Sequence, residues 1–192
     1  MNDEIDRLFA QVHGIEAQIE KRLDEQREQF RYRVAKGRAV FEAETGRLHR
    51  TLRASLPRYL WETPWRHLLV APVIYAMVVP FALLDLVLTV YQHICFRAWG
   101  IARVVRRDYI VLDRHRLGYL NIIERLNCLF CSYANGLLGY AREIAGRTEQ
   151  FWCPIRHATA IRGPHAHYKA FVDYGDAAGY RARLEELRTR LR

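Results

Sequence analysis

An apolar run in the middle of the chain constrains its fold more than any other feature. The 23 residues from Leu68 to Val90 contain one charged side chain, that of Asp85. At about 1.5 Å per residue they would extend roughly 34 Å as a helix, enough to cross a hydrocarbon core about 30 Å thick. A soluble domain of this size seldom needs a helix that is apolar on every face. We therefore predict one membrane segment, within residues 67–96.

Aromatic and basic residues border this segment. Trp61 and Trp65 precede it, and tryptophan suits the lipid headgroup region, where the indole ring is buried and its N–H stays hydrated. Arginines are abundant on both sides, so the positive-inside rule assigns no orientation to a single span. Balanced flanks suit a re-entrant hairpin with bends at Pro72 and Pro80 and both ends in the cytoplasm. The length of the run suits a single span, and both topologies stay open.

The charge of the chain predicts an anionic partner. The formal net charge is +9 and the pI is about 9.7. The basic residues flank the apolar segment instead of forming a stripe interleaved with aromatic residues. This arrangement suits a bilayer with anionic headgroups better than it suits nucleic acid. The acidic, polar residues 1–6 do not resemble a secretory signal peptide.

Residues 1–56 have the pattern of one long amphipathic helix. Apolar residues at its start recur at spacings of 3, 4, 3 and 4, the a/d repeat of a coiled coil: Ile5, Leu8, Val12, Ile15 and Ile19. The repeat weakens after Leu23 and resumes loosely through Phe30 and Val34. We predict a homo-oligomer formed through residues 5–34. The alternative is a solvated helix that packs on its own domain.

The rest of the chain divides into shorter units. Residues 57–66 form an interfacial linker with Trp and Pro, and residues 97–116 form a basic juxtamembrane stretch. Residues 117–176 form a helical domain that contains cysteines, and residues 177–192 form an amphipathic C-terminal helix. The predicted fold class is therefore mainly α, with a long N-terminal helix, one membrane segment and a helical domain that contains cysteines.

Three cysteines and a histidine carry the most specific chemistry. Cys128 and Cys131 form a Cys-x-x-Cys pair, and Cys153 and His157 follow at a spacing of four. Thiolates and imidazole are the ligands of tetrahedral zinc sites, and iron uses much the same set. We predict a zinc or iron ion on these four residues.

Polar residues near the cysteines are candidates for a second shell around the metal. On a helix, Glu124 and Asn135 share one face with the Cys-x-x-Cys pair. Glu143, Arg147 and Glu149 are polar neighbours that can orient the ligands, although Glu143 and Arg147 can also simply pair on a helix surface. His165 and His167 are interpreted as exposed histidines, with substitution for His157 as the alternative.

Other functions stay open. Cys128 and Cys131 can form a redox dithiol of a membrane-associated thiol oxidoreductase, although such motifs usually open a helix after a strand. The cysteines can also be small buried apolar residues. Asp85 is costly at bilayer depth, which marks either a site in a small channel or carrier component or a helix break at the interface. Enzyme activity is left undecided, since no familiar catalytic motif occurs in the sequence.

Part of the sequence resembles a known family. The residues that carry the resemblance are Asp85-Leu86, Tyr91-Gln92, Cys95-Phe96, Asp113-Arg114-His115, Tyr119-Leu120-Asn121-Ile122-Ile123-Glu124, Asn127-Cys128, Cys131-Ser132-Tyr133-Ala134-Asn135-Gly136, Glu143-Ile144 and Arg147-Thr148-Glu149-Gln150-Phe151-Trp152-Cys153-Pro154-Ile155. Over Pro80 to His157 the chain resembles a family of bacterial membrane-associated proteins with no assigned activity. The resemblance implies a bacterial membrane protein. We expect the inner membrane, with the cysteine-containing domain facing the cytoplasm.

Overall fold

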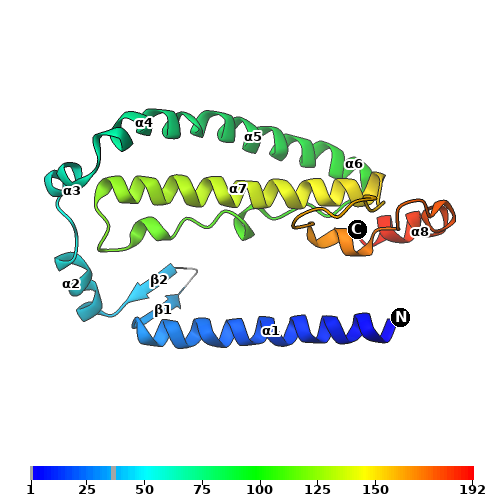
Figure 1. Cartoon of the computed structure of the whole chain (residues 1–192), viewed down its shortest axis with the longest axis horizontal. Helices are drawn as coiled ribbons and strands as arrows, with labels where there is room; N and C mark the ends of the chain where they lie inside the picture. Colours follow the sequence, from blue (N-terminus) through cyan, green and yellow to red (C-terminus); the bar gives the residue numbers. More distant parts are fainter. Residues whose placement is uncertain (1, 36–37) are drawn as a thin grey trace.

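The computed structural model describes residues 2–35 and 38–192 and shows a mainly α-helical chain (Figure 1). The elements, in order, are α1 (Asn2–Gln29), β1 (Tyr32–Ala35), β2 (Arg38–Phe41), α2 (Ala43–Thr51), α3 (Leu56–Glu62), α4 (Trp65–Ala76), α5 (Val78–Tyr91), the π-helical turn η1 (Gln92–Phe96), α6 (Arg97–Trp99), the 3-10 turns η2 (Arg106–Asp108) and η3 (Arg114–Arg116), α7 (Ile122–Trp152), the 3-10 turn η4 (Ala166–Ala170) and α8 (Ala177–Thr189). The predicted fold class is confirmed.

The prediction of one helical region over residues 1–56 is wrong beyond Gln29. An antiparallel pair, β1 and β2, follows α1, with Tyr32 opposite Phe41 and Val34 opposite Ala39. Aromatic and β-branched residues favour strands, and they alternate with arginine and alanine here, which outweighs the loose helical spacing. The side chains of Ile5, Leu8 and Val12 lie outside the described part of the chain, so the first coiled-coil positions cannot be compared.

The predicted membrane segment is a nearly continuous helix. The elements α4, α5, η1 and α6 together run from Trp65 to Trp99, 35 residues, and within the described chain this is the one helix long and apolar enough to cross a membrane. Pro80 causes no break because it lies in the first turn of α5, where a backbone N–H has no partner within its own helix. The chain does not reverse between Trp65 and Trp99, so the re-entrant hairpin is wrong.

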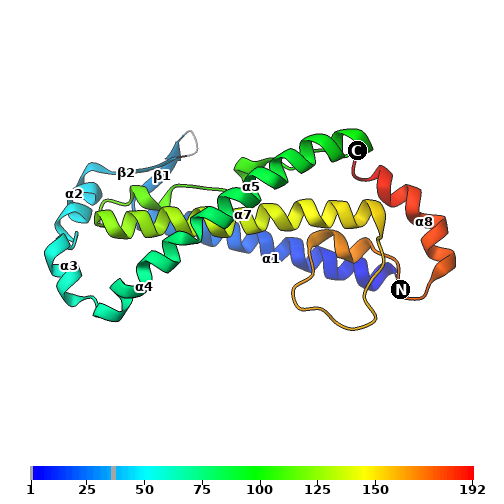
Figure 2. The same ribbon diagram turned by 90° about the horizontal axis from the view of Figure 1, so that it is seen from above.

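Helix α7 lies beside this apolar helix and runs in the same direction. Residue numbers rise together along the contact, from Tyr75 beside Phe130 to Trp99 stacked on Phe151. Figure 1 shows the two helices side by side, and Figure 2 shows that they cross obliquely. Within the helical domain predicted for residues 117–176, the helix begins at Ile122 because Asn121 caps it.

An extended segment connects the two parallel helices and runs back along α7. We call residues 100–121 the return segment. Its successive contacts descend α7: the carbonyl of Ala102 accepts from Arg147, and Arg114 donates to the hydroxyl of Ser132. At Gly136 the return segment approaches so closely that a Cβ would lie 2.6 Å from the carbonyl oxygen of Tyr109.

The buried core lies where α5, η1, the return segment and α7 meet. Its buried apolar members come from η1, the return segment, α7 and the C-terminal end: Phe96, Ile101, Val104, Ile110, Leu137, Tyr140, Ile144 and Leu191. Helix α5 contributes partly buried side chains that pack against them, namely Phe81, Leu84, Leu88 and Tyr91. The predicted C-terminal amphipathic helix corresponds to α8, which packs against α7 through the fully buried Leu187.

Candidate functional site

Helix α7 carries the Cys-x-x-Cys pair one turn apart. Cys131 is exposed and Cys128 is half-buried, and both thiols are free. Their neighbours point elsewhere: Phe130 contacts the rings of Tyr75 and Phe81, and Ser132 accepts from the return segment. The pair therefore lies on the side of α7 that turns away from the apolar helix. It begins six residues after the start of α7, and not at the helix N-terminus where a redox pair gains from the helix dipole.

The side chains predicted to support this pair are used inside α7. A carboxylate oxygen of Glu124 accepts from the backbone N–H of Asn121 at 2.7 Å, and the Asn121 side chain accepts from the N–H of Glu124 at 3.0 Å. This capping box fixes the start of the helix. Asn135 donates to the carbonyl oxygen of Cys131 at 2.9 Å. Both predicted second-shell residues therefore stabilise the helix.

Cys153 and His157 lie beyond the opposite end of α7. Cys153 is the C-cap residue of the helix, 22 residues after Cys131, which corresponds to about 33 Å along the axis. The ring of His157 stacks on Tyr168, with centroids 6.2 Å apart. Within residues 2–35 and 38–192, no three His, Cys, Asp or Glu side chains converge as metal ligands. The four predicted ligands therefore do not fit one ion within one chain in this conformation, and the zinc or iron ion stays a prediction.

The environment of Cys153 also disfavours a thiolate. Partial burial raises the pKa of its thiol above the ordinary value of 9.0, and the negative charge of Glu149 raises it further. Since the thiolate is the form that binds metals and attacks disulfides, the raised pKa lowers the fraction of Cys153 in that form at neutral pH.

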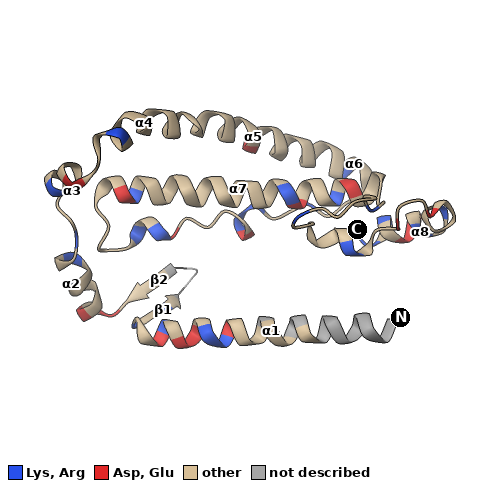
Figure 3. Ribbon diagram, viewed as in Figure 1, with Lys and Arg blue, Asp and Glu red and all other residues tan. Residues whose placement is uncertain are grey.

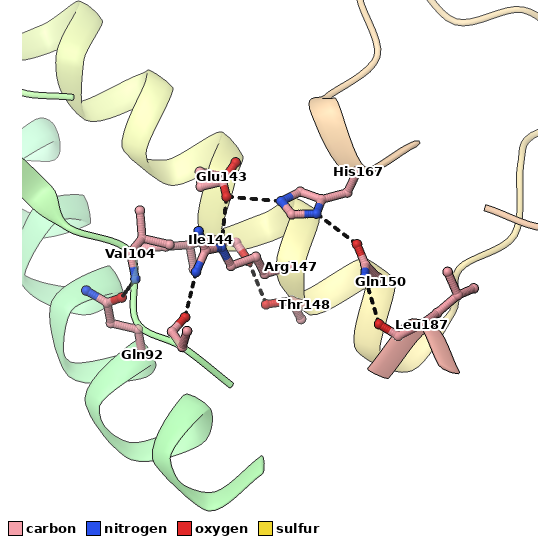
Figure 4. A network of polar contacts seen from close by, with 10 residues as sticks. Gln92, Val104, Glu143, Ile144, Arg147, Thr148, Gln150, His167 and Leu187 are labelled. Carbon is pink, nitrogen blue, oxygen red and sulfur yellow. Dashed lines mark hydrogen bonds and ion pairs between the residues drawn. The ribbon is translucent and has the colours of Figure 1, made fainter. Parts of the chain in front are cut away.

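A polar network joins four parts of the chain at the C-terminal half of α7 (Figure 4). Glu143 accepts from Arg147 at 2.8 Å and lies 3.0 Å from a ring nitrogen of His167. The other ring nitrogen of His167 lies 2.8 Å from the amide oxygen of Gln150, whose NH₂ group donates to the carbonyl of Leu187 in α8. With the bond from Arg147 to the return segment, this network ties η4, α8 and the return segment to α7.

The charge state of Glu143 follows from these contacts. Burial raises the pKa of this carboxyl, but the hydrogen bonds and positive charges of His167 and Arg147 outweigh burial and hold the pKa below its ordinary value of 4.5. The side chain is 15% exposed, and the carboxylate is therefore ionised and paired inside the structure. Glu143 and Arg147 do pair at i, i+4 as their spacing allows, but inside a network and not on an open helix surface.

His165 and His167 are not the exposed histidines that their loop position suggests. The side chain of His165 is 13% exposed and that of His167 is 20% exposed. A ring nitrogen of His165 lies 2.8 Å from a carboxylate oxygen of Glu149. Both rings lie over Gly146, where an added Cβ would approach His165 to 2.8 Å. Gly146 is the local sequence feature from which the close approach of the loop to α7 could have been predicted.

Asp85 is paired in the structure. Arg106 of the return segment donates two hydrogen bonds to its carboxylate, at 3.1 and 2.6 Å, and the hydroxyl of Tyr133 donates a third at 3.1 Å. The Asp85 side chain is 14% exposed. The carboxylate of Asp85 therefore faces α7 and the return segment, and its hydrogen bonds link these two elements to α5. Use of Asp85 by a channel or carrier stays a prediction.

An apolar cleft lies away from all of these residues. It has a volume of about 630 Å³ and separates the β1–β2 pair from η3. Its wall is lined mainly by Phe30, Tyr32, Phe41, Leu52, Leu117 and Tyr119. None of the predicted site residues lines it.

The outward face of the apolar helix is the most extensive candidate functional surface. Large apolar side chains there are more than half exposed, including Leu69, Val73, Val79, Leu83, Leu86 and Ile94. Figure 3 shows that α4 and α5 carry few charges along their length, whereas charged residues lie towards both ends of α7 and along the return segment. Exposure of so much apolar surface on one side marks a contact with lipid or protein.

Similarity to known proteins does not narrow the range of possible functions further. No protein-family model matches the chain, and no curated protein and no solved structure is detectably similar to it, so the family resemblance stays a prediction.

Proposed function

We propose that the protein is a membrane-attached scaffold that self-associates through α1. The exposed apolar face of α4 and α5 carries this proposal, because water is a poor solvent for it and a bilayer is a good one. Basic residues at both ends of the helix suit anionic headgroups, and Trp61 and Trp65, 92% and 73% exposed, are placed for the headgroup region. The family resemblance implies a bacterial membrane protein, and we propose the inner membrane, with the cysteine-containing domain on the cytoplasmic side, as its location.

Helix α1 supplies the self-association in this proposal. Ile15, Ile19 and Leu23 are 55%, 55% and 45% exposed, and α1 contacts mainly β1 among the other elements. A second copy of α1 would bury this stripe in the manner of a coiled coil, as the spacing of its apolar residues predicts.

Membrane attachment is tested by fractionation of cells that produce the full chain. The protein should remain with the membranes after high-salt and carbonate washes. Leu83→Arg places a charge on the outward face of α5 and should release a large fraction of the protein. Leu138→Arg places the same charge on α7 at a side chain 50% exposed, and should not. Complete release of the unaltered protein by carbonate would contradict the proposal.

Metal binding is a second candidate, favoured by the position of Cys128 and Cys131 on the same helix. Two chains that associate would supply four thiolates, the number that a tetrahedral zinc site uses. Elemental analysis of protein purified anaerobically in mild detergent tests it. A stoichiometric metal that is lost in Cys131→Ser and kept in Cys95→Ser would support this candidate. Protein without metal would exclude it.

A further inference from the structure

The structure constrains how the apolar helix can meet a bilayer. At about 1.5 Å per residue, its 35 residues extend roughly 52 Å, well beyond a hydrocarbon core of about 30 Å. Such a helix can cross the bilayer or can lie along its surface. The choice depends on what lies beside the helix, because those elements would share its depth.

Two further elements, α7 and the return segment, accompany the helix along its length. Tyr75 donates to Asn127 near the start of α7, and the hydroxyls of Tyr91 and Thr148 are 3.0 Å apart near its end. The return segment lies along the same stretch, from Val104, whose N–H donates to Gln92, down to η3. A helix that crossed the bilayer would therefore carry α7 and the return segment into the hydrocarbon core.

The return segment is unsuited to hydrocarbon. It has only two short 3-10 turns, and irregular backbone is not found exposed to lipid because its polar groups lack partners there. It also carries charges that face outward: the side chains of Arg107 and Asp108 are 90% and 65% exposed. A span placed closer to Trp65 would still carry charged residues into the hydrocarbon core. The turn η3, with Arg114 and Arg116, contacts α7 there and lies opposite Ser132.

The apolar helix, α7 and the return segment together have two unlike faces, one apolar and one polar, as an orientation along the membrane surface requires. The outward side chains of the helix are apolar between Leu68 and Val90, whereas α7 and the return segment cover its other face. Arg58 and Arg66 lie near one end of the helix and Arg97 and Arg103 near the other. These four can all reach the headgroups of one leaflet when the helix lies in the membrane plane. The balanced arginine flanks, which assign no orientation to a span, then have a physical explanation.

We infer that the helix from Trp65 to Trp99 lies in the plane of one leaflet of an anionic bilayer, with its outward face in the acyl region and α7 on the aqueous side. This inference rests on the proposed membrane attachment and adds its geometry. Membrane helices of this kind bury one apolar face and keep the rest of the protein in water. Both ends of α7 then face the same compartment.

Native cysteines in the first third of α7 and at its C-cap provide the test. Variants of the full chain keep either Cys131 or Cys153, both exposed, and have serine at the other three cysteine positions. Spheroplasts and inverted membrane vesicles from bacteria are treated with a maleimide that cannot cross membranes, and labelling is normalised to that in detergent-denatured protein. Both cysteines should react in inverted vesicles and neither in spheroplasts.

The other outcomes are distinct. Labelling of the two cysteines from opposite sides would establish a span and overturn the inference. Protection of Cys131 on both sides would place α7 in the bilayer and would also overturn it. Absence of the protein from washed membranes would contradict attachment itself, for instance if a second copy covers the apolar face. Fractionation before labelling separates that failure from a failure of the in-plane geometry.

Discussion

Arg106 holds the carboxylate of Asp85 with two hydrogen bonds, at 3.1 and 2.6 Å, and so fixes the return segment against the apolar helix. A charged residue that is expensive in an apolar segment thereby becomes a point of attachment. The pair bridges 21 residues of sequence, and Tyr133 completes it from α7. The three elements of the core meet at this carboxylate.

Removal of Arg106 should destabilise the protein. In Arg106→Leu the Asp85 carboxylate loses its counter-ion while 14% exposed. We expect a loss of about 1–3 kcal/mol in the free energy of unfolding, less than for a fully buried pair because Arg106 is itself half exposed. Chemical denaturation in mild detergent measures it. Arg107→Leu is the control, since that side chain is 90% exposed and should change stability by no more than about 0.5 kcal/mol.

The double variant of this pair gives a sharper result. Replacing Asp85 and Arg106 together by leucine removes both charges, and the stability should recover most of the loss seen in Arg106→Leu. A double variant no more stable than Arg106→Leu would show that the unpaired carboxylate is not the cause of the loss.

Two glycines of α7 should respond oppositely to alanine. In Gly136→Ala the new Cβ would lie 2.6 Å from the carbonyl oxygen of Tyr109, so the return segment must move, at a cost of about 1–3 kcal/mol. In Gly139→Ala the nearest atom is a ring carbon of Tyr109 at 3.4 Å, an ordinary contact. That variant should gain up to about 1 kcal/mol from helix propensity. Thermal unfolding of both variants measures the difference, and equal effects would contradict the packing described here.

The pH dependence of stability should depend on Glu143. Its pKa is lowered in the folded protein, so its contribution is present above the ordinary value of 4.5 and is lost as pH falls below that value towards the folded pKa. Glu143→Gln should therefore lower stability at pH 7 and flatten its decline between pH 5 and pH 3. Unfolding midpoints across that range measure it. Glu185→Gln, at a side chain 75% exposed, should leave the decline unchanged.

Self-association should depend on the apolar stripe of α1. Ile19→Lys places a charge on the predicted seam and should lower the oligomeric mass measured by sedimentation in detergent. Ala17→Lys places the same charge on an exposed position of the opposite face and should leave that mass unchanged. An equal effect of both substitutions, or of neither, would contradict a coiled coil through α1.

Local sequence patterns predict the helices well and their mutual arrangement poorly. The apolar run and the C-terminal amphipathic repeat act within a few residues, so they can be recognised in advance. The Asn121–Glu124 capping box is equally local, but Glu124 is predicted from the sequence to support a metal site instead. The β1–β2 pair was missed because its strands are short. The parallel course of α7 depends on pairs such as Tyr133 and Asp85, 48 residues apart, which no local pattern encodes.

The candidate site shows the same limit. Cys128 and Cys131 can be placed on one helix from their spacing. The distance to Cys153 depends on α7 continuing as one helix to Trp152, and the predicted domain of residues 117–176 does not define that length. The position of His165 and His167 in a loop predicts exposed histidines. Their burial results from a tertiary contact over Gly146.

Spin labels on the two faces of the helix pair test the central claim most directly, namely that the outward face of α4 and α5 contacts lipid. Labels at Val79 and Leu83, 72% and 61% exposed, are compared with a label at Asn135 on the open side of α7 after reconstitution in anionic vesicles. The account predicts frequent collisions with oxygen and few with a polar nickel complex at Val79 and Leu83, and the reverse at Asn135. Equal access of the nickel complex to all three positions would contradict it.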